Sequence, residues 1–278
     1  MDAVNHSDPD TQSGELWVCH LGTVPYTQAL AFQEQIRAQR QAGERPDTLL
    51  LLEHPPVYTR GRRSGGEDLP LGKDFYRAKG IDVHTTDRGG RLTYHAPGQL
   101  VGYPIMGITD VHRHLRTMED AILAALEQEG VQGRSRHEEG IDYTGVWVED
   151  RKIASIGVHV SRGVTTHGFA VNVTNDLEPF SWVVACGLPE VQMTSIAAEQ
   201  RRSDPRHASH DSTTRPVGKN VGVQCFRREM AYRFCLAHGR RQRLVSARRL
   251  GIDTTNLPGL ATEQAPKRGP SRREAIPA

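Results

Sequence analysis

Residues 145–174 of this chain read GVWVEDRKIASIGVHVSRGVTTHGFAVNVT. Apolar and β-branched side chains run through most of this stretch, and polar residues interrupt it at Asp150-Arg151 and at Arg162-Gly163. Apolar runs separated by short polar turns are typical of strands that pair with their neighbours in the chain. The stretch therefore predicts an antiparallel meander of three strands, over residues 145–148, 152–160 and 165–174.

Helical and strand patterns alternate around this meander. Apolar residues recur at helical spacing over residues 25–43 and 115–130, and each pattern ends at a glycine. Residues 47–52 form a continuous apolar run, which is typical of a buried strand. Further strands are predicted over residues 15–19, 81–86 and 99–105, and a last helix over residues 221–238. Helices packed on a mixed, largely antiparallel sheet give an α+β fold class.

Length and composition suggest one substantial domain with polar ends. The chain has 278 residues, of which 37% are hydrophobic, and we expect the domain over residues 15–240. Residues 1–14 lack the basic start and apolar run of a signal peptide, and we expect a flexible tail there. Residues 199–218 are expected to form a polar loop insertion, and the basic residues 241–278 a disordered tail. No apolar run approaches the ~20 residues that span a bilayer.

A glycine-rich stretch, RGGRLTYHAPGQ, occupies residues 88–99. Glycine adopts positive φ freely and has no Cβ, so Gly89-Gly90 and Pro97-Gly98 indicate a backbone that turns sharply and approaches another group. A hairpin turn without a ligand is the simplest explanation of a Gly-Gly pair alone. Four polar side chains exceed what such a turn needs and favour a ligand-binding loop: Arg88, Thr93, Tyr94 and His95.

Lys152 is unusual because lysine is rare in this chain. Only five of the 35 basic residues are lysine, and Lys152 is the only one between Lys79 and Lys219. Arginine stays protonated in proteins, whereas a partly desolvated lysine can act as a base. On the local pattern alone, a solvated residue beside a hairpin turn is the simpler interpretation, and a catalytic base is the alternative.

The four cysteines form no CxxC pair, which argues against a disulfide framework or a zinc site and favours a reducing compartment. Cys19 lies in a predicted strand, and Cys225 and Cys235 lie in a predicted helix, so we expect all three to be small core residues. Cys186 differs, because it follows the apolar residues 182–185 and precedes a Gly-Leu-Pro turn. Such a bend can present a thiol, which is either inert or catalytic.

Four segments in order resemble motifs of the lipoyl(octanoyl) transferase family. Residues 88–99 resemble its RGGxxTYHGPGQ, residues 151–157 its RKIASIG, residues 167–172 its HGFAVN, and residues 186–188 its Cys-Gly-Leu. The similarity covers about residues 15–240. Two departures are Ala96, where the family usually has glycine, and Val184-Ala185, where it often has a polar residue and proline. The methyl group of Ala96 restricts φ, so the turn is expected to differ in shape while the chemistry is kept.

The resemblance implies the fold of biotin and lipoate protein ligases and a reaction that needs no cofactor. It implies Cys186 as the nucleophile and Lys152 as the group that stabilises its thiolate and accepts a proton. It places substrate binding in three segments: Arg88, Gly89, Gly90, Arg91, Leu92, Thr93, Tyr94 and His95; Ser155, Ile156 and Gly157; and Gly168, Phe169 and Ala170. Ile156, Phe169 and Val171 are expected to line an octanoyl tunnel, to be ordinary core, or both. The thirteen histidines show no metal-ligand spacing, so no metal is predicted.

The implied reaction moves an octanoyl group from octanoyl-acyl carrier protein to a lysine of a lipoyl domain, as the first step of lipoate biosynthesis. The implied acceptors are the lipoyl domains of 2-oxoacid dehydrogenase complexes and the H protein of glycine cleavage. Exchange between two thioesters is nearly isoenergetic, so no ATP is needed. A free cysteine is only a few per cent thiolate at pH 7, and a nearby ammonium helps. The expected location is the cytoplasm, with no nucleic acid or membrane as a partner.

Two other functions stay open from the residues alone. An ATP-dependent lipoate or biotin ligase would activate the acid as an adenylate and would need no nucleophilic cysteine. A non-catalytic protein that binds acyl carriers is the second, since residues 227–278 carry twelve basic against four acidic side chains. The pairing of a lysine with a loop cysteine favours the transferase over both.

Overall fold

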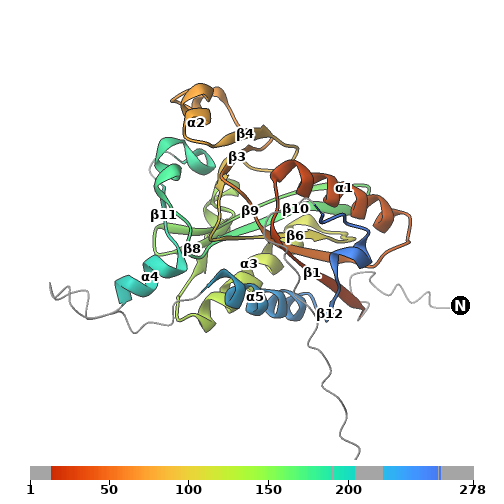
Figure 1. Ribbon diagram of the computed structural model, residues 1–278. Helices are drawn as coiled ribbons and strands as arrows, with labels where there is room; N and C mark the ends of the chain where they lie inside the picture. Colours follow the sequence, from red (N-terminus) through yellow and green to blue (C-terminus); the bar gives the residue numbers. More distant parts are fainter. Residues whose placement is uncertain (1–13, 189–190, 204–221, 256, 258–278) are drawn as a thin grey trace, which may run out of the picture.

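The computed structural model describes residues 14–188, 191–203, 222–255 and 257. These residues form a nine-stranded sheet with helices on both faces and a separate three-stranded sheet (Figure 1). The strands are β1 (Glu15–Thr23), β2 (Thr48–Glu53), β3 (Val57–Arg60), β4 (Asp82–Thr85), β5 (Leu92–His95), β6 (Gln99–Ile105), β7 (Arg134–Ser135), β8 (Gly145–Val148), β9 (Arg151–Ser161), β10 (Val164–Asn172), β11 (Gln192–Met193) and β12 (Arg241–Leu244). The helices are α1 (Tyr26–Gln41), α2 (Lys73–Ala78), α3 (Val111–Gln128), α4 (Ile196–Ser203) and α5 (Val223–Ala237).

The large sheet is mixed and largely antiparallel, which confirms the predicted fold class. Its order is β12-β1-β2-β6-β10-β9-β8-β7, with β11 beside β9. Strands β12, β1 and β2 run parallel, and each pair from β2 to β7 is antiparallel. The predicted meander is present as β8, β9 and β10. In it Gly168 lies opposite Gly157, and the turn uses Arg162 and Gly163 at positive φ (45° and 74°).

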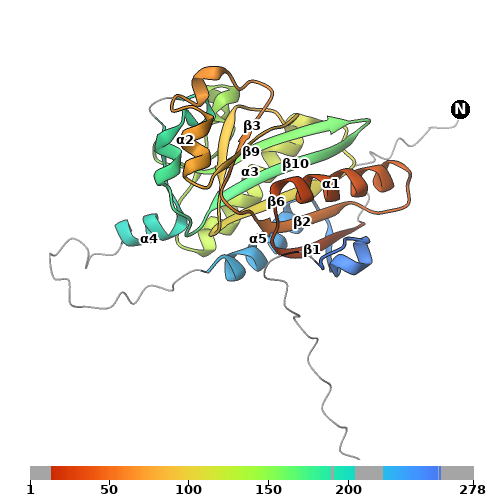
Figure 2. The same cartoon turned by 45° about the horizontal axis from the view of Figure 1, so that its top comes forward.

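Strand β2 has a continuous run of leucines because both faces of the strand are buried. Successive side chains of a strand point to opposite faces. Leu49 and Leu51 pack with α3 and α5, whereas Leu50 and Leu52 pack with α1. Figures 1 and 2 show α1 on one face of the sheet and the α3–α5 pair on the other. Burial of one such side chain stabilises the fold by roughly 1.5–3 kcal/mol, so β2 holds both helical layers to the sheet.

The small sheet, ordered β4-β3-β5, supports the segment that carries Cys186. Its aromatic residues Tyr58 and Tyr94 form a third apolar cluster, in which Val183 and Ala185 are also buried. The backbone N–H of Val184 donates to the carbonyl oxygen of Asp68 at 3.1 Å. The small sheet thus holds residues 183–187 in place beside the large one.

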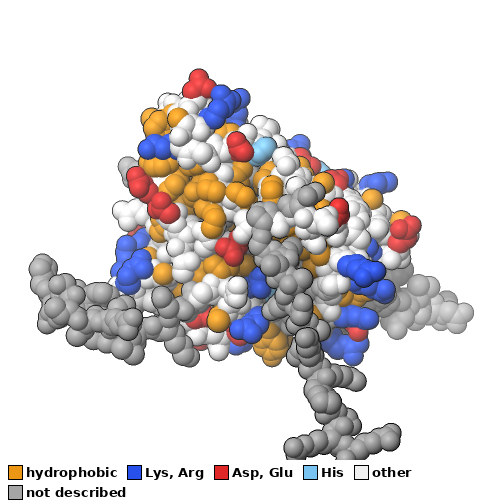
Figure 3. All heavy atoms as spheres, in the orientation of Figure 1, with side chains coloured by type: hydrophobic (Ala, Val, Ile, Leu, Met, Phe, Trp, Pro, Cys, Tyr) orange, Lys and Arg blue, Asp and Glu red, His pale blue; other side chains and the backbone are white. Residues whose placement is uncertain are grey.

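The folded region extends beyond residue 240, where the sequence analysis ended the domain. Arg241–Leu244 form β12 beside β1, and Leu250 and Ile252 are buried in the cluster that contains the core side of α1. Basic side chains gather over this region (Figure 3). The guanidinium groups of Arg243 and Arg249 lie 5.7 and 5.3 Å from the Trp17 ring centroid. Cation–π contacts and edge pairing therefore hold a segment that composition alone predicts to be disordered.

Two smaller expectations are also corrected. Residues 199–203, predicted as part of a loop, belong to helix α4, and residues 204–218 of that loop lie outside the described residues. Residues 1–13 and 258–278 of the predicted tails lie outside them as well. Cys225 is exposed, because α5 turns Phe226 and Met230 inward instead, while Cys19 and Cys235 are buried as predicted.

The described residues contain neither a membrane-spanning helix nor a cluster of metal-ligating side chains. None of their helices is long and apolar enough to cross a bilayer. Within the same residues, no three His, Cys, Asp or Glu side chains converge as metal ligands would.

Candidate active site

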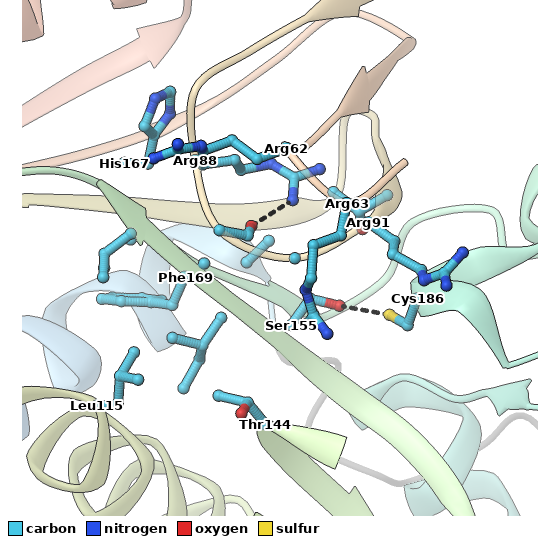
Figure 4. A pocket seen from close by; sticks show the side chains of 18 of the residues that line it. Arg62, Arg63, Arg88, Arg91, Leu115, Thr144, Ser155, His167, Phe169 and Cys186 are labelled. Carbon is cyan, nitrogen blue, oxygen red and sulfur yellow. Dashed lines mark hydrogen bonds between the residues drawn. The ribbon is translucent and has the colours of Figure 1, made fainter. Parts of the chain in front are cut away.

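Cys186 and Lys152 come together in space although they are 34 positions apart in the chain. Lys152 lies at the start of β9, and Cys186 lies in a 3₁₀ turn at Ala185–Gly187. The Lys152 Nζ donates to the Cys186 Sγ at 3.4 Å. The Ser155 Oγ lies 3.9 Å from the same sulfur (Figure 4). Cys186 has φ of 58°, a region that few residues with a Cβ adopt and that clusters at functional sites.

The ammonium of Lys152 is enclosed by the protein. The residue is only 2% exposed, and within the described part of the chain no carboxylate lies within 4.0 Å of it. Its Nζ lies 5.1 Å from the centroid of the Trp147 ring, a cation–π contact. Gly145 leaves room for the side chain, since a Cβ there would come within 2.9 Å of the Lys152 Cε. Among the described residues, the Cys186 sulfur is therefore the group that accepts a hydrogen bond from the buried Lys152 side chain.

The glycine-rich loop lies directly against β9. The N–H of Gly89 donates to the Val158 carbonyl oxygen at 2.9 Å, and a Cβ at Gly157 would come within 2.7 Å of the Gly89 oxygen. The Arg88 guanidinium donates to both the carbonyl and the hydroxyl oxygen of Thr59, at 2.6 and 2.9 Å. Burial lowers the pKa of Arg88. Arg88 therefore ties the loop to β3 as well as facing the cavity.

Arg91 lies beside the candidate nucleophile. A Cβ at Gly187 would come within 2.0 Å of the Arg91 Cδ and 2.4 Å of its Nε, so the side chain crosses Gly187. The guanidinium pairs with Glu67 at 3.3 Å and with the buried Asp68 at 3.7 Å. Figure 4 shows Arg91 on the same side of the cavity as Cys186. The arginine therefore braces the turn that carries the thiol.

These groups open onto one cavity of about 480 Å³. The structure brings to it every predicted substrate-binding residue except Tyr94, together with Lys152 and Cys186. An apolar cavity with a few convergent polar groups is typical of a small-molecule site. Its apolar wall consists of Leu92, Val101, Val111, Leu115, Ile156, Val158, Phe169 and Ala170.

Tyr94 does not line the cavity. Leu92, Thr93 and His95 of β5 line the cavity, whereas Tyr94 is buried in the apolar cluster of the small sheet. Its ring packs against Tyr58 and Phe180, with centroids 5.2 and 5.4 Å apart. The resemblance predicts one continuous binding segment, and Tyr94 is its exception because its ring packs between the rings of the small-sheet cluster.

The expectations for Val171 and His95 agree with the structure only in part. Val171 lies in the main core and does not line the cavity, unlike Ile156 and Phe169. His95 lines it, but its Nδ1 already pairs with the Gln99 Oε1 at 2.7 Å. Burial lowers the pKa of His95 well below its usual value, so the ring is neutral at pH 7.

The rim of the cavity contains residues that the sequence analysis did not select. An ion pair of 2.8 Å joins Arg63, after β3, to Asp142, before β8. Ile141 lies beside it and is 64% exposed. Neither loop has a periodic pattern, and the pair depends on how the two sheets meet. The feature of the sequence that could have indicated this rim is the pair Arg62-Arg63 directly after Gly61.

A carboxylate and two histidines hold another part of the wall. The Asp87 carboxylate lies 2.8 Å from the His167 Nε2 and 3.4 Å from the His159 Nε2. Burial opposes the ionised form of Asp87, but hydrogen bonding to His167 and the charges of both histidines lower its pKa overall. Burial lowers the pKa of His167. The cluster fixes the start of the HGFAVN segment beside the glycine-rich loop.

Comparison with known proteins places this arrangement in a family. Residues 25–213 match the lipoyl protein ligase A/B catalytic domain. An octanoyltransferase of Rubrobacter xylanophilus is 46% identical over 188 residues, which are 66% of this chain and 83% of that protein. An octanoyltransferase of Solibacter usitatus is 49% identical over 183 residues, 64% and 80% of the two chains.

Solved structures agree on the fold. A bipartite lipoate protein ligase of Thermoplasma acidophilum aligns with a TM-score of 0.63 at 18% identity, covering 84% of this chain and 87% of that one. Lipoate-protein ligase A bound with ATP aligns with a TM-score of 0.64, also at 18% identity, covering 84% and 89%. The domain match and the identity to curated relatives decide the classification: the chain belongs to the octanoyltransferase family and carries its lipoyl protein ligase catalytic domain.

Proposed function

We propose that this chain transfers an octanoyl group from octanoyl-acyl carrier protein to a lysine of lipoyl domains, through a thioester on Cys186. The acceptors would be the lipoyl domains of 2-oxoacid dehydrogenase complexes and the glycine cleavage H protein, in the cytoplasm. The observation that carries the proposal is the 3.4 Å contact between the Lys152 Nζ and the Cys186 Sγ at one end of an apolar cavity. A thiolate stabilised by a buried ammonium is an activated nucleophile.

In the first step the Cys186 sulfur attacks the carbonyl carbon of the octanoyl thioester. The new carbon–sulfur bond forms, the bond to the carrier's sulfur breaks, and the carrier's sulfur takes a proton from the Lys152 ammonium and leaves as a thiol. Lys152 is placed to hold the Cys186 thiolate before the attack. One thioester replaces another, so the acyl group keeps its activation and no nucleotide is consumed.

In the second step the amine of the lipoyl-domain lysine attacks the same carbonyl carbon. A carbon–nitrogen bond forms, the bond to Cys186 breaks, and the amine loses a proton to Lys152. Lys152 is neutral at this point because it gave its proton to the carrier's sulfur in the first step, and accepting the amine's proton restores the ammonium beside the released Cys186 thiolate. The apolar wall excludes water from the thioester, which limits hydrolysis.

The proposal is tested by intact-mass spectrometry of the protein incubated with octanoyl-acyl carrier protein in the absence of ATP. We expect a mass increase of one octanoyl group, located on Cys186 by peptide mapping, and its loss after addition of a lipoyl domain. Cys186→Ala should abolish both. Cys225→Ala is the matched control, because Cys225 is an exposed thiol outside the cavity and its removal should change neither.

Other outcomes would support the alternatives. An acceptor octanoylated only when ATP and magnesium are present would indicate a ligase that forms an adenylate. Binding of the acyl carrier without acylation or turnover would indicate a non-catalytic binding protein. Activity retained in Cys186→Ala would remove the thioester from the mechanism.

A further inference from the structure

We propose that the Phe169 ring sets the length of the acyl chain that the cavity accepts, and that Gly102 fixes the position of this ring. The inference rests on the proposed acyl transfer and adds a specificity determinant to it.

The Phe169 ring separates the cavity from the main core. The residue is 2% exposed, lines the cavity, and also belongs to the core cluster formed with α3 and α5. Figure 4 shows Phe169 and Leu115 on the side of the cavity away from Cys186 and Arg91. A chain whose carbonyl carbon is bonded to Cys186 and whose tail follows the apolar wall would therefore end near this ring.

Gly102 provides the space that the ring occupies. It lies directly opposite Phe169 in the antiparallel pair of β6 and β10. A Cβ at Gly102 would lie 2.1 Å from the Phe169 Cζ and 2.5 Å from its Cε1. The ring thus lies flat over the glycine backbone, in contact that no other residue type at 102 permits without a shift.

The ring is also held from the core side. The ring of Phe234, on α5, stacks on it with centroids 5.9 Å apart and an interplanar angle of 28°. The backbone of β6 and the Phe234 ring block two directions of movement. The third direction leads into the cavity, so a side chain larger than hydrogen at position 102 would push the Phe169 ring toward the acyl chain.

These contacts predict opposite effects for two substitutions. Phe169→Leu removes the ring and deepens the cavity, whereas Gly102→Ala moves the ring inward and shortens it. Each methylene transferred from water to an apolar site contributes about a fourfold gain in affinity. A chain that is too long loses this gain for every methylene left without room.

The experiment is a competition between hexanoyl-, octanoyl- and decanoyl-acyl carrier protein, read as the masses of the acyl groups on the enzyme. For Phe169→Leu we expect the ratio of decanoyl to octanoyl to rise at least fourfold. For Gly102→Ala we expect the ratio of hexanoyl to octanoyl to rise by a similar factor. Phe226→Leu and Gly222→Ala are matched controls, since neither residue lines the cavity and both ratios should stay unchanged.

Circular dichroism identifies the variants that fold, and Phe169→Met offers a milder change if Phe169→Leu is unstable. Unchanged ratios in a folded Phe169 variant that is still acylated on Cys186 would overturn the inference alone. No acylation of wild-type Cys186 by any of the donors would overturn both the inference and the proposed function.

Discussion

Cys186 and Gly187 have φ of 58° and 71°, and the Arg91 side chain crosses the second of them. Positive φ at Gly187 avoids strain because glycine has no Cβ, and the same absence makes room for the arginine. The position of the Cys186 thiol therefore depends on Gly187, which leaves room for Arg91. The Asp68 carboxylate in turn holds the Arg91 guanidinium. The site depends on this backbone conformation as much as on its ionisable groups.

Gly187→Ala should impair the site without unfolding the protein. The new methyl group would meet the Arg91 Cδ at 2.0 Å and would strain a backbone at φ of 71°. We expect the rate of Cys186 alkylation by iodoacetamide to fall at least tenfold, with little change in the melting temperature. Gly222→Ala is the control, since no atom of the described residues lies within 4 Å of its added Cβ. Alkylation at the wild-type rate would show that Arg91 does not brace the turn.

Lys152→Arg should preserve a positive charge and lose the base. A guanidinium is never deprotonated in a protein, so it cannot accept the proton of the attacking amine. It is also larger, and Gly145 and Trp147 leave little room around the Lys152 side chain. We expect octanoyl transfer to the lipoyl domain to fall at least a hundredfold in single-turnover kinetics, and acylation of Cys186 to fall less. Equal losses in the two steps would contradict the role of Lys152 as a base.

Single residues differ in how well sequence predicts them. Cys186 and Lys152 are expected at the site because their segments resemble the family motifs; the local pattern alone leaves an inert thiol and a solvated lysine as simpler interpretations, and the structure brings the two side chains within 3.4 Å of each other. Trp147 and the Arg63–Asp142 pair could not be predicted. Their contacts depend on how β8, β9 and the small sheet meet, and no local pattern encodes that arrangement.

Elements are predicted best where hydrophobic periodicity is strong. The meander β8–β9–β10 and the strand β2 were predicted to within a few residues because apolar side chains bury them on at least one face. The small sheet was missed as a unit, since β3 and β5 are four residues long and one of them lies inside the glycine-rich motif. Strand β12 reads Arg-Gln-Arg-Leu and has no alternation, so it is recognised only from its pairing with β1.

Truncation after Arg240 should destabilise the domain, whereas a chain ending at Leu257 should be as stable as the full chain. The shorter form loses β12 and three buried apolar side chains, Leu250, Ile252 and Leu257. Burial of three such side chains contributes roughly 4.5–9 kcal/mol, a large fraction of a typical domain stability. We expect a melting temperature lower by about 10 °C or more in thermal unfolding followed by circular dichroism. Equal melting temperatures for the two truncated forms would show that the folded domain ends at residue 240.

Across the whole molecule, several histidines are buried in neutral form. His54 is enclosed at the junction of the two sheets, where its Nδ1 lies 2.6 Å from the Val24 carbonyl oxygen and its Nε2 2.7 Å from the Tyr103 hydroxyl. Burial lowers the pKa of His54 to about 4. His114 lies on α3, on the other face of the large sheet. Burial lowers the pKa of His114 to about 3, and the charge of the neighbouring His238 contributes a smaller decrease. These rings make the stability of the entire domain depend on pH.

The domain should lose stability as the pH falls from 7.5 to 5. Above a pH of about 6.5 these histidines are neutral in both states, so they contribute no pH dependence. Below it the unfolded chain binds protons that the buried rings of His54 and His114 do not, and stability decreases by about 2 kcal/mol for each at pH 5. Urea unfolding at the two pH values measures the difference. His54→Gln should reduce this difference by about 2 kcal/mol, while His112→Gln, a change at an exposed ring, should leave it unaltered. A pH difference that is the same in both variants and the wild type would mean that His54 becomes protonated without unfolding, and that the junction of the two sheets admits the proton and its water.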